Sequence, residues 1–335
     1  MNRLRAVWLA VVLALTLMLS SGCEQAKQQE EKQSLRIGVS LYRGDDTFIN
    51  NIRAELEKTA KAYEQETGVK IKLDVQEARG NQNTQNNQVE RFISLGCDVL
   101  CVNMVDRTGA SAIIEKAMTA GVPVIFFNRQ PVDEDMDRWD QLYYVGVDPK
   151  ESALLQGKIV VDLYRENPEA LDLNGDGRIS YVLLEGEPNH QDSMIRTEWS
   201  VQTLKDGGLP IEKIAGGIAN WERSQASAMM EQWLEKYPGP VELVISNNDD
   251  MALGAIDTLD RKGITSVCVV GIDGTAPGLE AVKAGKMCGT VSSDKEQYAR
   301  AIFSMAVDKA MGQDIRPELE LENGKYYRCP QAIIR

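Results

Sequence analysis

Residues 99–128 read VLCVNMVDRTGASAIIEKAMTAGVPVIFFN, and this stretch decides the fold. Two short runs, 99–103 and 122–128, are rich in apolar residues, and a segment with apolar positions at helical spacing, 110–120, separates them. Each run is apolar on both faces, as expected of a strand buried between layers of helices. The stretch therefore predicts a strand, a helix and a second strand parallel to the first.

The same alternation extends in both directions from this unit. Toward the N-terminus we expect strands over 36–42 and 69–75 and helices over 48–66 and 83–95. Toward the C-terminus we expect strands over 143–147, 179–185, 243–246 and 268–272, with helices over 152–164, 195–204, 225–236 and 251–262. This pattern predicts an α/β fold of two doubly wound parallel-sheet domains in series.

The first two dozen residues differ from the rest of the chain. Arg3 and Arg5 precede an almost unbroken apolar run over 6–19, which is too short to span a membrane, and Ser20-Ser21-Gly22-Cys23 follows. This pattern is typical of a bacterial lipoprotein signal peptide over 1–22, with Cys23 lipidated, although an ordinary signal before a chance cysteine is the alternative. We interpret residues 23–34 as a polar tether and expect an exported protein, periplasmic or anchored to the outer face of the cell membrane.

The charge, the cysteines and the missing motifs exclude several classes of protein. Removing residues 1–22 lowers the basic residues from 37 to 35 against 50 acids, so the net charge becomes 35 − 50 = −15, which argues against nucleic acid as a partner. No serine-hydrolase, zinc-protease, Walker or dinucleotide-binding motif is present in the sequence, so we expect no enzyme. We interpret five further cysteines as buried thiols and leave a disulfide open: Cys97, Cys101, Cys268, Cys288 and Cys329.

Short hydrogen-bonding side chains follow nearly every predicted strand. In a doubly wound sheet, ligands bind at the loops beyond the carboxyl ends of the strands. The residues at these ends are Asp45, Asp46, Asn103, Asn128, Asn189, His190, Asn247, Asn248, Asp249, Asp273, Ser292, Ser293 and Asp294. Carboxylates and carboxamides suit a ligand made of hydroxyl groups. The sequence therefore predicts a polar site in a cleft between two domains.

Two aromatic residues and one short motif add to this site. Phe48, after the first strand end, and Trp221, at the start of a helix, are candidates to pack against the two faces of a pyranose ring, although core packing is the alternative for each. Asp192 and Arg196 are one helical turn apart behind His190, the only histidine, so both can point toward a shared ligand. A surface cap with an ion pair is the alternative for this motif.

Residues 172–180, DLNGDGRIS, match a calcium-binding loop. A glycine stands at loop position 6 and an apolar residue at position 8. The oxygen donors at positions 1, 3, 5, 7 and 9 would be Asp172, Asn174, Asp176, the carbonyl of Arg178 and Ser180. Position 12, which needs a bidentate glutamate, is Leu183, so a metal would need a carboxylate from elsewhere in the chain. A turn rich in Asp and Gly, without metal, is the alternative.

These motifs, in this order, resemble those of the galactose/glucose-binding proteins of bacterial ABC transporters, in the periplasmic-binding-protein and LacI-like superfamily. The resemblance covers residues 35–330 and rests on YRGDDTF (42–48), VNMVD (102–106), FFN (126–128), YYVGVDPKES (143–152), DLNGDG (172–177), GEPNHQDSMIR (186–196), SNNDDMALGA (246–255) and GIDG (271–274). It implies sugar contacts by Asp46, Phe48, Asn103, His190, Asp192, Arg196, Trp221, Asn248 and Asp273, with Ser293 in place of the family's asparagine. It also implies that Glu242 supplies the missing calcium ligand.

The resemblance further implies a type I periplasmic-binding-protein fold and a function. The protein would be an extracytoplasmic solute-binding lipoprotein that captures galactose or glucose by domain closure and delivers it to an ABC-importer permease, with a chemoreceptor as a second candidate partner. The implied domains are 35–128 with 294–328 and 129–293 with 329–335, joined by crossings near 128–131, 291–294 and 328–330. A binding protein for ribose or xylose and a sugar sensor that feeds a chemoreceptor are the alternatives. A LacI-type repressor would instead begin with a helix-turn-helix.

Overall fold

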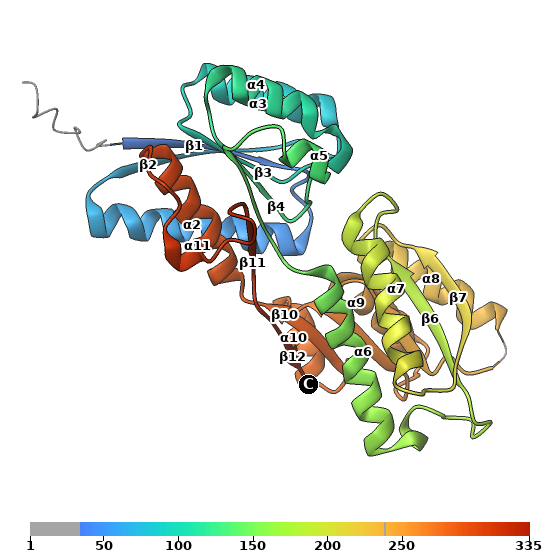
Figure 1. The fold of residues 1–335 in the computed structure, drawn as a ribbon. Helices are drawn as coiled ribbons and strands as arrows, with labels where there is room; N and C mark the ends of the chain where they lie inside the picture. Colours follow the sequence, from blue (N-terminus) through green and yellow to red (C-terminus); the bar gives the residue numbers. More distant parts are fainter. Residues whose placement is uncertain (1–33, 238) are drawn as a thin grey trace, which may run out of the picture. The chain divides into compact units, whose positions relative to one another are not determined.

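The computed structural model describes residues 34–237 and 239–335, and within them the chain forms two six-stranded sheets (Figure 1). We call each sheet with its helices a lobe. The first sheet has the order β11-β5-β4-β3-β1-β2, with strands Tyr326–Arg328, Leu142–Gly146, Val124–Phe127, Val99–Val102, Ser34–Leu41 and Lys70–Glu77. The second has the order β12-β10-β9-β8-β6-β7, with strands Gln331–Ile334, Gly289–Ser293, Cys268–Asp273, Leu243–Ser246, Ile179–Glu185 and Ile211–Ile218. In the second sheet β12 runs antiparallel to β10, whereas β10, β9, β8, β6 and β7 pair in parallel.

The stretch at 99–128 forms β3, helix α4 (Ala110–Ala120) and β4, with β3 and β4 parallel, as predicted. All residues of both strands are buried, because helices cover both faces of the sheet. Gly121, at φ 67°, ends α4 in the left-handed conformation that glycine adopts without strain. The short turn that follows leads the chain directly into β4.

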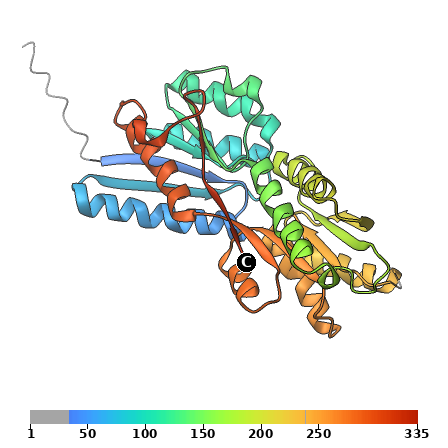
Figure 2. The same cartoon turned by 60° about the horizontal axis from the view of Figure 1, so that its bottom comes forward.

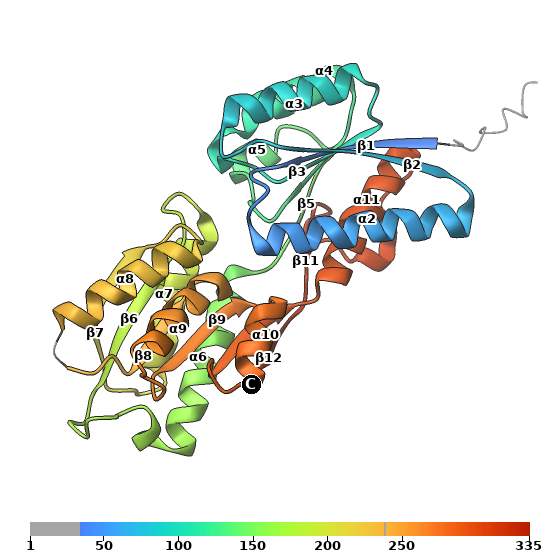
Figure 3. The same cartoon turned by 180° about the vertical axis from the view of Figure 1, so that it is seen from behind.

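Helices cover both faces of the first sheet. On one face α2 (Thr47–Thr67) and α11 (Lys295–Ala310) pack together and against the sheet, and on the other lie α3 (Gln82–Ser94) and α4 (Figures 1 and 3). The N-cap of α2 is Asp46, which follows β1 after a short loop, and the N-cap of α11 is Asp294, which directly follows β10. A short helix, α5 (Asp133–Met136), lies between β4 and β5.

The second lobe repeats this arrangement. Helices α6 (Pro149–Glu166) and α7 (Gln191–Asp206) share one apolar cluster with the sheet. Helices α8 (Arg223–Lys236) and α9 (Asp249–Arg261) share another, and α10 (Ala276–Lys283) adds to it. Each lobe thus has two apolar layers, one on either side of its sheet, as predicted for doubly wound domains.

The boundary between the lobes corrects one prediction. The sequence prediction divided the chain at 128/129 and assigned 143–147 to the second domain, but β5 pairs in parallel with β4 and β11 and therefore belongs to the first sheet. The first crossing lies at 147–148, between β5 and α6. The other two, at Asp294 and at Cys329-Pro330, lie where they were expected, and the last appears in red in Figure 2.

The predicted signal peptide, lipidated Cys23 and most of the predicted tether lie outside the described residues. The last tether residue, Ser34, already belongs to β1. No helix among the described residues is long and apolar enough to cross a membrane. The five cysteines of this part of the chain are free thiols; Cys288 is partly exposed and the other four are buried.

Candidate functional site

The carboxyl ends of the strands of both sheets surround one small cavity, which we call the inner cavity. Residues from the first lobe follow β1 or β4 or begin α2, and residues from the second lobe follow β6, β7, β8 or end β9. The full lining is Tyr42, Asp46, Phe48, Asn128, Arg129, His190, Asp192, Arg196, Trp221, Asn248 and Asp273. Eight of the predicted sugar contacts are therefore brought together from segments far apart in the sequence.

Asp46 is held rigidly on the first-lobe side of the inner cavity. As N-cap of α2, its Oδ1 accepts the N–H of Ile49 at 2.8 Å, and its Oδ2 accepts the hydroxyl of Tyr42 at 2.6 Å. Phe48, in the first turn of α2, packs edge-to-face on Tyr298 of α11, with ring centroids 5.8 Å apart. These contacts position both side chains.

Asn103 lies behind the cavity wall instead of lining it. The side chain is fully buried, its Oδ1 accepts the N–H of Tyr42 at 3.3 Å, and its Nδ2 donates to the carbonyl of Phe127 at 3.2 Å and to Oδ1 of Asn128 at 3.0 Å. Asn128 itself has a left-handed φ of 62° and reaches the cavity. In this structure Asn103 therefore positions Asn128 and is not itself exposed to a ligand.

His190 and Trp221 form an aromatic wall on the second-lobe side. Nδ1 of His190 accepts the N–H of Asp192 at 3.1 Å and caps α7, so the ring proton is on Nε2. The two rings pack edge-to-face at 5.1 Å. Trp221 and Asn220 both have left-handed φ values, 67° and 51°, which turn the chain sharply after β7 and bring the indole into the cavity wall.

Arg196 links two strand ends of the second lobe to the first turn of its own helix, α7. Its Nη1 donates to the carbonyl of Asn247 at 2.9 Å and lies 3.6 Å from Oδ1 of Asp273, and its Nη2 donates to Asp192 at 3.2 Å. Asn248 caps α9 by accepting the N–H of Met251 at 2.9 Å. Arg196 thus connects Asp192, Asn247 and Asp273 through charge-assisted contacts, and Asn248 lines the same cavity.

Burial shifts the pKa values of three titratable groups that line the inner cavity. Burial raises the pKa of Asp273 well above its usual range, against the opposing effect of Arg196. Burial likewise raises the pKa of Asp192, and the positive charge of Arg196 partly offsets this increase. Burial and the nearby Arg129 and Arg196 lower the pKa of His190 well below 6.5, so the imidazole is neutral at neutral pH. These groups are desolvated, as expected of a site that excludes water around a ligand.

The cavity wall holds buried donors that lack an acceptor. Five buried side-chain nitrogens in the described part of the chain have no hydrogen-bond partner, and three of them belong to residues that line the inner cavity: Nε of Arg129, Nε of Arg196 and Nε1 of Trp221. An unpaired buried donor costs about 1–3 kcal/mol. A ligand rich in hydroxyl oxygens would satisfy such donors.

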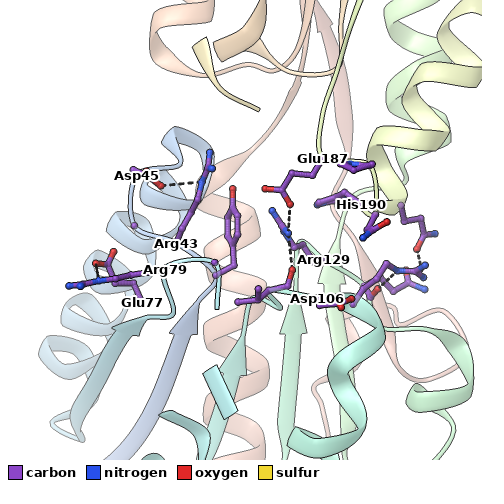
Figure 4. A pocket seen from close by; sticks show the side chains of 17 residues that line it. Arg43, Asp45, Glu77, Arg79, Asp106, Arg129, Glu187 and His190 are labelled. Atoms are coloured by element: carbon purple, nitrogen blue, oxygen red, sulfur yellow. Dashed lines mark hydrogen bonds and ion pairs between the residues drawn. The ribbon is translucent and has the colours of Figure 1, made fainter. Parts of the chain in front are cut away.

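The inner cavity is too small for a hexose in this structure. Its volume is about 30 Å³, room for a couple of water molecules, whereas pockets for small organic ligands usually exceed about 300 Å³. A ligand of that size would fit only if the two lobes shifted about the three crossings. A second, larger cavity of about 890 Å³ shares Tyr42, Arg129 and His190 with the first. Figure 4 shows the side chains that line this larger cavity.

The remaining predicted contact, Ser293, is buried at the end of β10. It lines a small neighbouring void with Phe48, Asn128 and Asp273 and does not reach the inner cavity. Conversely, sequence reasoning assigned no ligand contact to Tyr42, Asn128 or Arg129. Asn128 was among the polar strand ends, and Tyr42 stood in a quoted motif. No sequence pattern pointed to Arg129, apart from its position directly after Asn128.

The predicted calcium loop brings its expected sixth residue into place. Glu242 is fully buried, and its carboxylate accepts the N–H groups of Leu173, Asn174 and Ser180 at 2.7–3.2 Å. Asp172 accepts the N–H groups of Asp176 and Gly177 at 3.1 and 2.9 Å. Within the described residues, no three His, Cys, Asp or Glu side chains are gathered closely enough to hold a metal. The donor set fits calcium in kind, because it consists of hard oxygens, but the carboxylates would have to turn toward an ion.

Comparison with known proteins identifies the family. A family model described as a periplasmic binding protein domain matches residues 37–314. The D-galactose/methyl-galactoside binding periplasmic protein MglB of Haemophilus influenzae is 36% identical over 279 residues, which cover 83% of this chain and 82% of that protein. This chain is a periplasmic binding protein.

Two further proteins are similar over most of their length. A putative rhizopine-binding protein of Rhizobium meliloti is 29% identical over 84% of this chain and 87% of its own. The structure of an ABC transporter solute binding protein from Bacillus halodurans C-125 with bound myo-inositol matches with a TM-score of 0.74 and 31% identity, over 91% of this chain and 95% of that one. The type I fold predicted from the sequence is confirmed. The family consists of exported solute-binding proteins, not of enzymes.

Proposed function

We propose that this periplasmic binding protein captures one hexose, D-galactose or D-glucose, between its lobes and delivers it to the permease of an ABC importer. Its similarity to a galactose-binding relative supports the hexose, and its similarity to an ABC transporter solute binding protein supports the importer. The observation that carries the proposal is the set of orphaned donors around a cavity walled by aromatic rings. A sugar offers hydroxyl oxygens to the donors and C–H faces to the rings.

Each lining residue has a defined part in this proposal. Phe48 and Trp221 would cover opposite faces of the pyranose, one from each lobe. Carboxylates accept hydrogen bonds from sugar hydroxyls, and guanidinium, amide and imidazole N–H groups donate to them. The acceptors would be Asp46, Asp192 and Asp273, and the donors Arg196, Asn248 and Nε2 of His190. Asn103 and Ser293 would not contact the sugar in this arrangement of the lobes, and Asn103 would act by positioning Asn128.

Closure follows from how the contacts are divided between the lobes. Asp46 and Phe48 stand on the first lobe, and His190, Arg196 and Trp221 stand on the second. A sugar bound to only one lobe would make only part of its hydrogen bonds, so the closed state is favoured by the ligand's greater affinity for it. The closed, loaded protein is the form that we expect the permease to receive.

Export and anchoring are part of the same proposal. The apolar run before Ser20-Ser21-Gly22-Cys23 supports cleavage and lipidation at Cys23, which would hold the protein at the outer face of the cell membrane. Mass spectrometry of the N-terminal peptide from membrane fractions tests this: a diacylglyceryl group on Cys23 is expected, and an unmodified Cys23 thiol would contradict it.

We also propose a structural calcium ion at residues 172–180. Glu242 would supply the bidentate carboxylate, and Asp172, Asn174, Asp176, the carbonyl of Arg178 and Ser180 the remaining oxygens. The contacts between Glu242 and the loop support this, because they hold the missing carboxylate beside the other donors. The ion would brace the chain between α6 and β6 and take no part in sugar contact.

A panel of ligands tests the proposed function. The melting temperature of the mature chain, residues 23–335, would be measured with D-galactose, D-glucose, D-ribose, D-xylose and myo-inositol. Because a ligand that binds only the folded state raises the melting temperature, a hexose should produce the largest shift. A larger shift with myo-inositol, the compound bound to the Bacillus halodurans protein, would replace the hexose with a cyclitol. If only a pentose raises the melting temperature, the family assignment stands but the proposed hexose ligand is wrong.

A further inference from the structure

The larger cavity has no role in holding a single hexose. Its volume of about 890 Å³ lies within the range of pockets that enclose whole small-molecule ligands. Its lining, which Figure 4 shows, has only Tyr42, Arg129 and His190 in common with the inner cavity. We call it the outer cavity. Its walls come from the loops after β1, β2, β3 and β4 in the first lobe and from the loop between β6 and α7 in the second.

The outer cavity persists although the lobes are already bridged beside it. Nη1 of Arg43 pairs with Glu222 of the second lobe at 2.6 Å, and Nη1 of Arg129 pairs with Glu187 at 2.7 Å. Nη2 of Arg107 also donates across the cleft, to Gln191 at 2.8 Å. The outer cavity is therefore present while these contacts connect the two lobes, and it is not a gap between separated lobes.

Arg129 sits where the two cavities meet and is built for a ligand. Its side chain is 93% buried, stacks on the Tyr42 ring at 3.7 Å from the centroid and donates to the carbonyl of Val105 at 3.0 Å. Its Nε nevertheless has no hydrogen-bond partner. A buried guanidinium donor without an acceptor is costly, which indicates an acceptor that arrives with the ligand.

The walls of the outer cavity favour a neutral polar ligand. Four arginines line it, Arg43, Arg79, Arg107 and Arg129, and four carboxylates, among them Glu77 and Glu187, match their charge. An anion or a cation would meet groups of its own sign at short range. A neutral polyhydroxyl group can accept from the arginines and donate to the carboxylates without that repulsion.

We propose that the outer cavity is a second sugar subsite, so that the protein takes a neutral disaccharide whose first ring fills the inner cavity. The inference rests on the proposed sugar-binding function and extends it. The first ring would lie between Phe48 and Trp221, and the glycosidic link would pass Arg129. The second ring would bind among the arginines and carboxylates of the outer cavity.

Titration calorimetry of the mature chain tests this inference with four disaccharides that contain galactose or glucose: lactose, melibiose, cellobiose and maltose. At least one should bind at one site per chain, with a Kd equal to or lower than that of its better-binding monosaccharide. A double variant, Glu77→Ala with Arg79→Ala, removes an outer-cavity pair that is 3.5 Å apart and touches neither the inner cavity nor the other lobe. It should weaken disaccharide binding about tenfold or more and leave monosaccharide binding within about twofold.

A matched control is Arg53→Ala with Glu57→Ala, an exposed ion pair on α2 that lines neither cavity and should change neither affinity. If monosaccharides bind but each of the four disaccharides binds more weakly than its better-binding monosaccharide, the second subsite is wrong and the proposed function stands. If a disaccharide binds and the Glu77/Arg79 double variant binds it equally well, the outer cavity is not where its second ring lies. If no sugar binds at all, both the proposed function and the subsite fail.

Discussion

A single methyl group at Gly186 tests how Trp221 is positioned in the sugar site. A Cβ on Gly186 would lie 2.2 Å from Cη2 and Cζ2 of the Trp221 ring, whereas ordinary contact begins at 3.4 Å. The ring would therefore have to move by 3.4 − 2.2, or about 1.2 Å. Backbone strain does not add to this, because the φ of Gly186 is outside the left-handed region. Gly186→Ala should thus displace the indole and change little else.

The expected loss can be set against complete removal of the ring. We expect Trp221→Ala to weaken hexose binding by about 2–3 kcal/mol, or about 30- to 150-fold, because it removes one aromatic face from a buried site. Gly186→Ala should lose up to the same amount. If the methyl group acts only through the ring, the double variant should bind no more weakly than Trp221→Ala alone, which is strong non-additivity.

Titration calorimetry of the two single variants and the double variant measures this coupling. Trp233→Ala is the control, because Trp233 is buried on α8, packs in the same apolar cluster and lines no part of the inner cavity. Its melting temperature should fall while its affinity for hexose stays near that of the wild type. Additive losses in the double variant, or full affinity in Gly186→Ala, would refute the placement of Trp221 against the ligand.

Three further predictions concern the metal, the histidine and the thiols. Chelation with EDTA, or Glu242→Gln, should lower the melting temperature, since an ion at 100-fold excess over its Kd stabilises the folded state by about 2.7 kcal/mol. The control Glu212→Gln loses only an exposed ion pair with Arg178 and should leave the melting temperature unchanged. If neither EDTA nor Glu242→Gln changes the melting curve, residues 172–180 form a plain Asp-Gly turn without metal. His190 is the only histidine, and its NMR signal should show no titration near pH 6.5 in the folded protein. Since the unfolded chain binds the proton at a higher pH than the folded protein does, the free energy of unfolding should fall as the pH drops below about 6.5. A titration of His190 near pH 6.5 in the folded protein would contradict this. Iodoacetamide should label Cys288, partly exposed and with its pKa lowered by a hydrogen bond from Cys268, before the other four described thiols, and equal labelling rates by mass spectrometry would count against it.

Much of the fold was accessible from the sequence because parallel strands buried on both faces are nearly all apolar. Strands such as β3, β4 and β8 are short runs of this kind, and the helices between them carry apolar positions at helical spacing. Of the four edge strands, β2 was predicted and the other three were not: β7 contains two adjacent glycines and is half exposed, β11 has only three residues and β12 only four. The partner of β11 is β5, which lies far away in the sequence, and no local pattern can specify such a pairing.

The lobe assignment of β5 shows the same limit. Its apolar sequence predicts a buried strand, but a strand of this kind could belong to either sheet. Only its pairing with β4 and β11 shows that β5 belongs to the first sheet. The loop that contains α5 delays the first crossing until 147–148.

The polar strand ends predicted which residues would lie together, because parallel strands bring all their carboxyl ends to one edge of the sheet. That reasoning cannot separate a residue that lines a cavity from one just behind it. Asn103 and Asn128 are both asparagines after neighbouring strands, and a 3.0 Å hydrogen bond between them places one in front of the other. Arg129 escaped prediction because its contact with Tyr42 joins residues 87 positions apart (129 − 42) and depends on the stacking of a long side chain.

The central claim, that one hexose binds between the lobes, is tested most directly by titrating the mature chain with D-galactose and D-glucose in a calorimeter. One of the two should bind at a single site per chain with a Kd below about 10 µM, because stacking on two rings and a full set of hydrogen bonds in a closed cleft give a small ligand high affinity. Absence of binding by both hexoses, with measurable binding of a pentose or myo-inositol under the same conditions, would contradict the claim.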